Sequence, residues 1–127
     1  MKVKEIGLCW IVVKDLNAAI KYYTEVVGLK LAEFHEEFAW AEVEAEDGGC
    51  RLGLAQENPE QKAGQNAVMT FSVANLDKAI EEMVKKGAVR EGEVCEISGH
   101  VRMQSMIDPD GNRFQMCQVL HHSCCHC

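Results

Sequence analysis

Large apolar side chains are the residues of this chain best suited to hold a small organic molecule. Both tryptophans of the chain, Trp10 and Trp40, fall at strand positions whose alternation directs them to one side of the expected sheet, together with Phe38 and Met103. These four side chains could line an apolar, aromatic cavity for a planar ligand. The alternative is that they fill a core and leave no room for a ligand.

Polar side chains expected on the same side of the sheet could orient such a ligand. Arg51 could hold a carboxylate, phosphate or sulfate, and the alternative is a salt bridge to Glu42 or Glu44. Glu42 could act as a general base if burial raised its pKa, and the alternative is a solvated strand face. No catalytic residue is assigned. The candidate ligand-binding residues are Trp10, Phe38, Trp40, Arg51, Met103, Ser105 and Gln115.

The last seven residues, 121–127, form a tail in which every residue except Ser123 is His or Cys. Such side chains bind soft or borderline metals. The spacing matches no zinc finger, and adjacent cysteines rarely close one tetrahedral site. A tail without a function is therefore the favoured interpretation, and adventitious metal binding or a bridge within a dimer are the alternatives.

The charge balance excludes several classes of partner. Thirteen Lys and Arg face twenty Asp and Glu, for a net charge of −7. Because no run of basic residues is present, we expect no binding to nucleic acid or to anionic membranes. The apolar run at residues 6–13 is too short to span a bilayer and lacks a leader cleavage site. We expect a cytoplasmic protein whose partner is a small organic ligand. If Arg51 contacts that ligand, the ligand is expected to be an anion.

Hydrophobic periodicity predicts the order βαβββ twice within the 127 residues. The leucine at position 16 and the isoleucine at 20 recur sixty positions later, as Leu76 and Ile80. Short polar residues precede both expected helices, and Gly28 and Gly87 end them. Residues 57–65 read as a linker. The expected strands are 6–13, 29–36, 38–46, 50–55, 67–73, 89–97, 101–107 and 112–118, and the first helix runs to about residue 27.

Three segments carry a resemblance to a known family: residues 12–16 (VVKDL), 22–31 (YYTEVVGLKL) and 108–112 (DPDGN). In this order and spacing, the chain resembles the vicinal-oxygen-chelate superfamily, the glyoxalase/bleomycin resistance proteins, over residues 3–119. The resemblance implies an α+β fold in which two βαβββ modules form a cup-shaped mixed sheet with helices on the outside. It implies one domain, residues 1–120, with modules at about 3–56 and 66–119, and a homodimer.

Enzymes of that superfamily bind a divalent metal through four inward-facing side chains. By resemblance, these positions fall on Leu8, Gly53, Val68 and Gln115. Three of them offer no ligand atom, so we expect neither a metal nor another cofactor. The favoured function is a metal-independent protein that binds a small molecule in the cup. The alternatives are a metal-dependent glyoxalase-like lyase or isomerase with non-standard ligands, and a non-catalytic dimerisation or regulatory domain with a filled cup.

Overall fold

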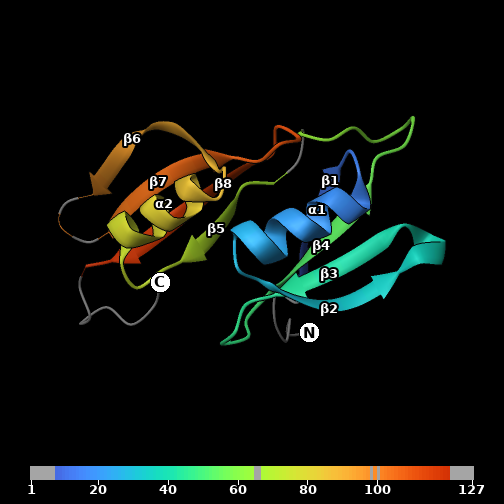
Figure 1. Cartoon of the computed structure of the whole chain (residues 1–127), viewed down its shortest axis with the longest axis horizontal. Coiled ribbons are helices and arrows are strands. Elements are labelled where there is room, and N and C mark those ends of the chain that lie inside the picture. The colour runs from blue at the N-terminus through green and yellow to red at the C-terminus, as the bar shows by residue number, and fades with distance from the viewer. Residues whose placement is uncertain (1–7, 65–66, 98, 100, 121–127) are drawn as a thin grey trace, which may run out of the picture. The chain divides into compact units, whose positions relative to one another are not determined.

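The structure, a computed structural model, describes residues 8–64, 67–97, 99 and 101–120 (Figure 1). The tail at residues 121–127 lies outside the described residues, and so does His100. The chain divides into two units, Met1–Ala67 and Val68–Cys127. Within the described part of the chain, no helix is long and apolar enough to cross a membrane.

The first unit is a βαβββ module whose four strands form one mixed sheet. The sheet order is β1-β4-β3-β2, with β1 parallel to β4 and the other neighbours antiparallel. This confirms the predicted element order for the first half of the chain. The elements are β1 (Leu8–Val13), α1 (Leu16–Lys21), the π-helix η1 (Tyr22–Val26), β2 (Lys30–His35), the 3₁₀ helix η2 (Glu36–Phe38), β3 (Trp40–Glu44) and β4 (Arg51–Gln56).

The second unit repeats the arrangement, with the sheet order β5-β8-β7-β6. Here β5 is parallel to β8, and β6 and β7 are antiparallel to their neighbours. The two four-stranded mixed sheets confirm the predicted α+β fold built from two βαβββ modules. The elements are β5 (Met69–Ser72), α2 (Leu76–Lys85), β6 (Val89–Ile97), β7 (Val101–Ile107) and β8 (Arg113–Val119).

Each module has its core between its helix and one face of its sheet. Helix α1 packs against β3 and β4, and α2 packs against β7 and β8. Strand alternation explains which side chains are buried, because every second residue points to the helix. In the first unit these are Ile11, Val13, Ala41, Val43, Leu52 and Leu54, and in the second they include Met106, Phe114 and Met116.

A glutamine at the end of the last strand of each module holds the start of that module's helix. The backbone N–H of Leu16 donates to Gln56 Oε1 at 2.8 Å, and the N–H of Leu76 donates to Gln118 Oε1 at 2.7 Å. The first N–H groups of a helix have no partner within the helix, so these side chains satisfy them. The repeated contact shows that the modules share tertiary detail as well as element order.

The first helix differs from its prediction near its C-terminal end. Asp15 caps its start, accepting a hydrogen bond from the backbone N–H of Ala18 at 3.1 Å. The α-helix ends at Lys21 and continues as η1 to Val26, where a single helix to residue 27 was predicted. A side-chain hydrogen bond from Thr24 Oγ1 to the carbonyl of Ile20, at 2.8 Å, lies within this wider turn. Gly28 follows with a φ of +93°.

Candidate functional site

The face of the first sheet that points away from α1 collects most of the predicted site residues of this unit. The pairing register places Trp10 beside Gly53, and Gly53 beside Glu42. Residues paired directly across neighbouring strands share one face of a sheet. We call this surface the tryptophan face, and its members on β1, β3 and β4 are Leu8, Trp10, Val12, Trp40, Glu42, Glu44, Arg51, Gly53 and Ala55.

The two tryptophans form a tilted pair on this face. Their ring centroids lie 6.2 Å apart with an angle of 58° between the planes. Trp10 is 37% exposed, and Trp40 is half-buried. The indole N–H of Trp40 donates to Glu42 Oε2 at 3.0 Å, which fixes the orientation of the ring. The pair is therefore an accessible aromatic surface with one polar group already satisfied.

Gly53 provides the space that the Trp40 indole occupies. A Cβ built on Gly53 would lie 2.3 Å from Cη2 of Trp40 and 3.0 Å from Cβ of Trp10. Both distances are too short for a side chain to fit without movement. Glycine at this strand position thus lets the indole lie directly against the sheet backbone.

Arg51 lies among three carboxylates. Its Nη1 donates to Glu33 Oε2 at 2.5 Å and to Glu42 Oε1 at 3.1 Å, and its Nε lies 3.3 Å from Glu44 Oε1. The hydrogen bonds to Glu42 and Glu33 raise the pKa of Arg51 above its already high ordinary value. The salt bridge weighed as an alternative to anion binding is therefore present. Three carboxylates surround one guanidinium, so this part of the face has a net negative charge.

His35 and Glu33 extend the charged cluster along β2. His35 Nε2 lies 2.9 Å from Glu33 Oε1, and His35 Nδ1 lies 3.6 Å from Glu37 Oε1. The hydrogen bond with Glu33 raises the pKa of His35, and hydrogen bonds from His35 and Arg51 lower the pKa of Glu33. Sequence reasoning did not select either residue. Alternation along β2 predicts that Glu33 and His35 lie on one face of the strand. It does not predict which β3 residues they pair with, because a register shift between Leu31 and Glu33 decides that.

Phe38 is placed differently from its prediction. It belongs to the 3₁₀ helix η2 that precedes β3, and it is 76% exposed. The next residue, Ala39, has a φ of +51°, so the chain turns before the strand begins at Trp40. Strand alternation therefore does not place Phe38 beside Trp40. Its ring lies near that of His35, with 6.2 Å between the centroids.

In the second unit, the pairing register brings Ser105 and Gln115 side by side. Ser105 on β7 pairs with Gln115 on β8, and Thr70 on β5 pairs with Gln115 from the other side. The Thr70 hydroxyl donates to Gln115 Oε1 at 3.3 Å. Met103 lies two residues before Ser105, opposite Cys117. The three predicted residues of this unit thus share one face, with a row of neutral polar groups beside a thioether.

The four positions that the resemblance assigned to a divalent metal do not fit one. Leu8 has no donor atom, the space at Gly53 is filled by the Trp40 indole, and the Gln115 amide oxygen already accepts from Thr70. Val68, 59% exposed, also lacks a ligand atom. Such sites need imidazole or carboxylate ligands. Among the described residues, no three His, Cys, Asp or Glu side chains gather in a way that could hold a metal ion.

Comparison with known proteins extends over nearly the whole chain. The family model described as "Glyoxalase/Bleomycin resistance protein/Dioxygenase superfamily" matches residues 5–116. No curated protein matches the chain in sequence.

Solved structures share the fold at low sequence identity. A member of the same superfamily from Sphaerobacter thermophilus has a TM-score of 0.83 and 16% identity, with 93% of this chain and 99% of that chain covered. TnmS3, an antibiotic-binding protein from Streptomyces sp. CB03234, has a TM-score of 0.81 and 21% identity, with 94% and 98% covered. A glyoxalase family protein from Bacillus anthracis has a TM-score of 0.76 and 18% identity, with 94% and 98% covered.

Proposed function

Since the chain belongs to the glyoxalase/bleomycin resistance protein/dioxygenase superfamily, we propose that it binds a small planar aromatic molecule without using a metal ion. The observation that carries this proposal is the tilted pair of Trp10 and Trp40, lying against the sheet on the side away from α1. Large aromatic side chains are costly to leave in water, and a planar ligand stacked on them would remove that surface from solvent. The antibiotic-binding description of TnmS3 is in keeping with a binding role.

The charged cluster beside the tryptophans sets the charge of the proposed ligand. Arg51 already pairs with Glu33, Glu42 and Glu44, so an anionic group would have to displace a carboxylate and would be repelled by the others. A cationic group would gain from the carboxylates and from the indole faces. The ligand we propose is therefore neutral or cationic, which replaces the anion suggested by Arg51 considered alone.

The remaining predicted residues keep proposed roles of their own. Met103 would provide an apolar contact, and Ser105 and Gln115 would provide neutral hydrogen bonds on their shared face. Phe38 is exposed enough to contact a ligand from η2, but strand geometry does not require it to do so. A metal-dependent lyase or isomerase with non-standard ligands would need His, Cys, Asp or Glu side chains gathered elsewhere, and no such group is present among the described residues, so we do not propose that activity.

A charge series of one ring system tests this function. The probes are 2-naphthol, 2-naphthoate and naphthalen-2-ylmethylammonium, titrated while the tryptophan fluorescence of the protein is followed. We expect the cation to bind at least as tightly as the neutral probe and the anion to bind most weakly. We also expect Trp40→Leu to weaken binding of the cation about tenfold. Stacking of a planar ring on an aromatic side chain, together with the cation–π contact, contributes about 1–3 kcal/mol.

Phe34→Leu is the matched control for this experiment. Phe34 is also an exposed aromatic residue on the first sheet, but it pairs with Ala41 and so lies on the opposite face from Trp40. Its replacement should leave the affinity within about twofold. Absence of binding by all three probes, or equal losses in the Phe34 and Trp40 variants, would refute the proposed function.

We also propose that the protein is a homodimer, as the family resemblance implies. Sedimentation equilibrium should then give a mass about twice the 14.2 kDa of the chain. A mass of one chain at micromolar concentration would contradict this proposal and would leave ligand binding to be judged on the charge series.

A further inference from the structure

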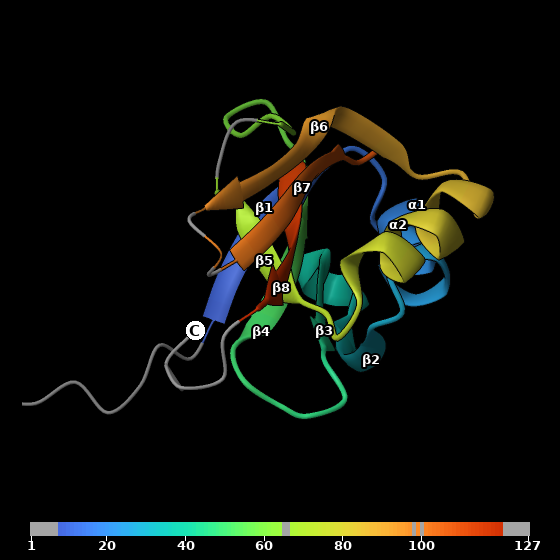
Figure 2. The same ribbon diagram turned by 90° about the vertical axis from the view of Figure 1, so that its left-hand side faces the viewer.

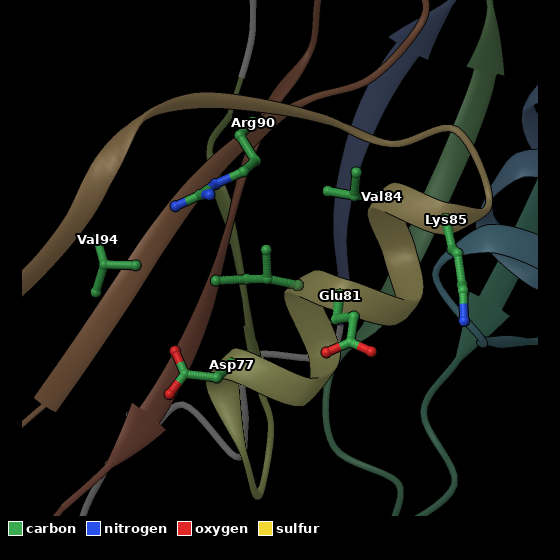
Figure 3. A pocket seen from close by; sticks show the side chains of 7 residues that line it. Asp77, Glu81, Val84, Lys85, Arg90 and Val94 are labelled. Atoms are coloured by element: carbon green, nitrogen blue, oxygen red, sulfur yellow. The ribbon is translucent and has the colours of Figure 1, made fainter.

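A groove lies within the second unit, between α2 and β6. This groove has a volume of about 520 Å³, within the ~300–1,000 Å³ range of small-molecule sites. Five of its lining side chains come from the helix and two from the strand. Figure 3 shows how they surround the groove. The lining residues are Asp77, Ile80, Glu81, Val84, Lys85, Arg90 and Val94.

The path of β6 explains why the groove is there. Glu91 pairs with Ser105 and Cys95 pairs with Met103, so four residue steps on β6 span only two on β7. Gly92, inside this irregularity, has a φ of +76°, which favours glycine. Extra residues of this kind bend a strand, and both views of the chain show β6 following a curved path (Figures 1 and 2). Val84 on α2 consequently stays 44% exposed.

Arg90 is held over the groove by a buried amide. The Gln104 side chain is 0% exposed, and its Oε1 accepts hydrogen bonds from Arg90 Nε at 3.0 Å and Nη2 at 2.7 Å. The Gln104 amide nitrogen donates to the backbone carbonyls of Gly92 at 3.0 Å and Ser105 at 2.9 Å. These contacts orient the guanidinium and use only part of its five N–H groups.

Arg90 also differs from the other arginines in its partners. Arg51, Arg102 and Arg113 all form ion pairs with carboxylates, whereas Arg90 forms none within the part of the chain that the structure describes. Its hydrogen-bond acceptor is a neutral amide, so its positive charge is not compensated by a contact.

The two acidic residues of the groove have basic neighbours. Asp77 accepts two hydrogen bonds from Arg102, at 3.0 and 3.2 Å, so its charge is compensated. Glu81 lies one helical turn before Lys85, the spacing at which opposite charges attract each other. Glu81 and Lys85 thus carry opposite charges on neighbouring turns of α2, and the groove combines apolar side chains with the positive charge of Arg90, which forms no ion pair among the described residues.

We propose that this groove is a second binding site, for a small amphipathic carboxylate whose apolar body lies on Ile80, Val84 and Val94 and whose carboxylate binds Arg90. A planar guanidinium held in a fixed orientation is well suited to a carboxylate, because two parallel N–H···O bonds can form. The site lies wholly in the second unit and uses none of the residues of the tryptophan face.

Hexanoate and the uncharged hexanamide are the probes for this site. Binding is followed by two-dimensional NMR of the full chain, with the methyl groups of Val84 and Val94 as reporters. We expect hexanoate to shift these methyl resonances in a saturable way. Arg90→Met should weaken hexanoate binding at least tenfold while leaving hexanamide binding within twofold, because methionine keeps an apolar side chain at this position but has no charge to bind the carboxylate. The variant also removes the two hydrogen bonds from Arg90 to Gln104.

A second pair of variants does not depend on the buried amide. Val84→Glu places a carboxylate in the groove at an exposed helix position, and should weaken hexanoate binding at least tenfold. Its matched control is Val89→Glu, since Val89 is 57% exposed in the same unit but does not line the groove. That variant, and Arg113→Met, should bind within twofold of the unchanged chain.

Three results would overturn the proposal. The first is the absence of saturable shifts at Val84 and Val94 in the unchanged chain. The second is an equal loss of hexanoate binding in the Val84 and Val89 variants. The third is an equal loss of hexanoate and hexanamide binding in Arg90→Met, which would mean that Arg90 supports the structure rather than the carboxylate.

Discussion

At the residue scale, the contact between Trp40 and Gly53 determines the shape of the tryptophan face. The indole lies where a Cβ of residue 53 would be, so the ring position depends on the absence of a side chain. The alternation of their strands predicts that both residues lie on one face of the sheet. It does not predict their contact, because that depends on the pairing register of β3 with β4.

Gly53→Ala should therefore move the Trp40 ring. We expect a loss of about 1–3 kcal/mol in the free energy of unfolding, the usual cost of overpacking, and a shift in tryptophan emission. Urea unfolding measures the first and fluorescence the second. In a Trp40→Leu background, the same alanine should cost much less. An equal cost in both backgrounds would show that the indole is not what the new methyl group meets.

The contact between His35 and Glu33 predicts a pH dependence. Because Glu33 raises the pKa of His35 above 6.5, the contact stabilises the fold below that pH and loses its effect as pH rises through the raised pKa. Because the pKa of Glu33 is lowered below 4.5, the effect is also lost as pH falls through the lowered value. An NMR titration of the His35 ring should show the raised pKa.

Two glutamine variants test the origin of that shift. Glu33→Gln should return the pKa of His35 toward its ordinary value, because it removes the largest cause. Glu37→Gln is the control, since its carboxylate lies farther away, at 3.6 Å, and should have the smaller effect. The reverse order would show that the assigned hydrogen bond is not the cause.

At the element scale, hydrophobic periodicity predicts the strands and helices of this chain, but it does not predict the local irregularities within them. All eight predicted strands are present, because alternation and turn residues are local properties of the chain. The π-helix η1 and the 3₁₀ helix η2 were not predicted. In η1 only Tyr23 is buried, and η2 has no buried residue, so neither gives the periodic burial pattern from which helices and strands are predicted. The displacement of Phe38 from the strand is the consequence that matters for the site.

The glutamine at the end of β8 tests how the elements are joined. Gln118→Met should lower the free energy of unfolding by about 1–2 kcal/mol, because the N–H of Leu76 loses its acceptor at a partly buried helix start. Gln61→Met is the control, since the hydrogen bonds of Gln61 use its backbone only. Urea denaturation compares the two, and equal losses would contradict a role for the Gln118 amide.

At the scale of the whole molecule, the question is whether metal belongs to the folded domain or to the His/Cys tail. The structure offers no fitting ligand set at Leu8, Gly53 and Gln115, and the tail lies outside the described residues. Elemental mass spectrometry on the full chain and on a chain ending at Val119 separates the two. We expect less than stoichiometric metal in the shorter chain. Near-stoichiometric metal in both samples would place a site in the domain and favour an enzyme.

The sequence by itself determined the βαβββ repeat, the family and, with the exception of Phe38, the strand faces on which the candidate residues lie. These follow from period-two alternation, from turn-forming glycines and from short motifs, all of which are local in the chain. Tertiary structure alone decided the chemistry of those faces. The sequence suggests Arg51 as an anion-binding residue, but in the structure it is surrounded by three carboxylates. The sequence does not single out Arg90, but the structure places its guanidinium beside a groove. The reason is that the groups surrounding a charged side chain decide what it can bind. Strand register and bulges bring those groups together from distant parts of the chain.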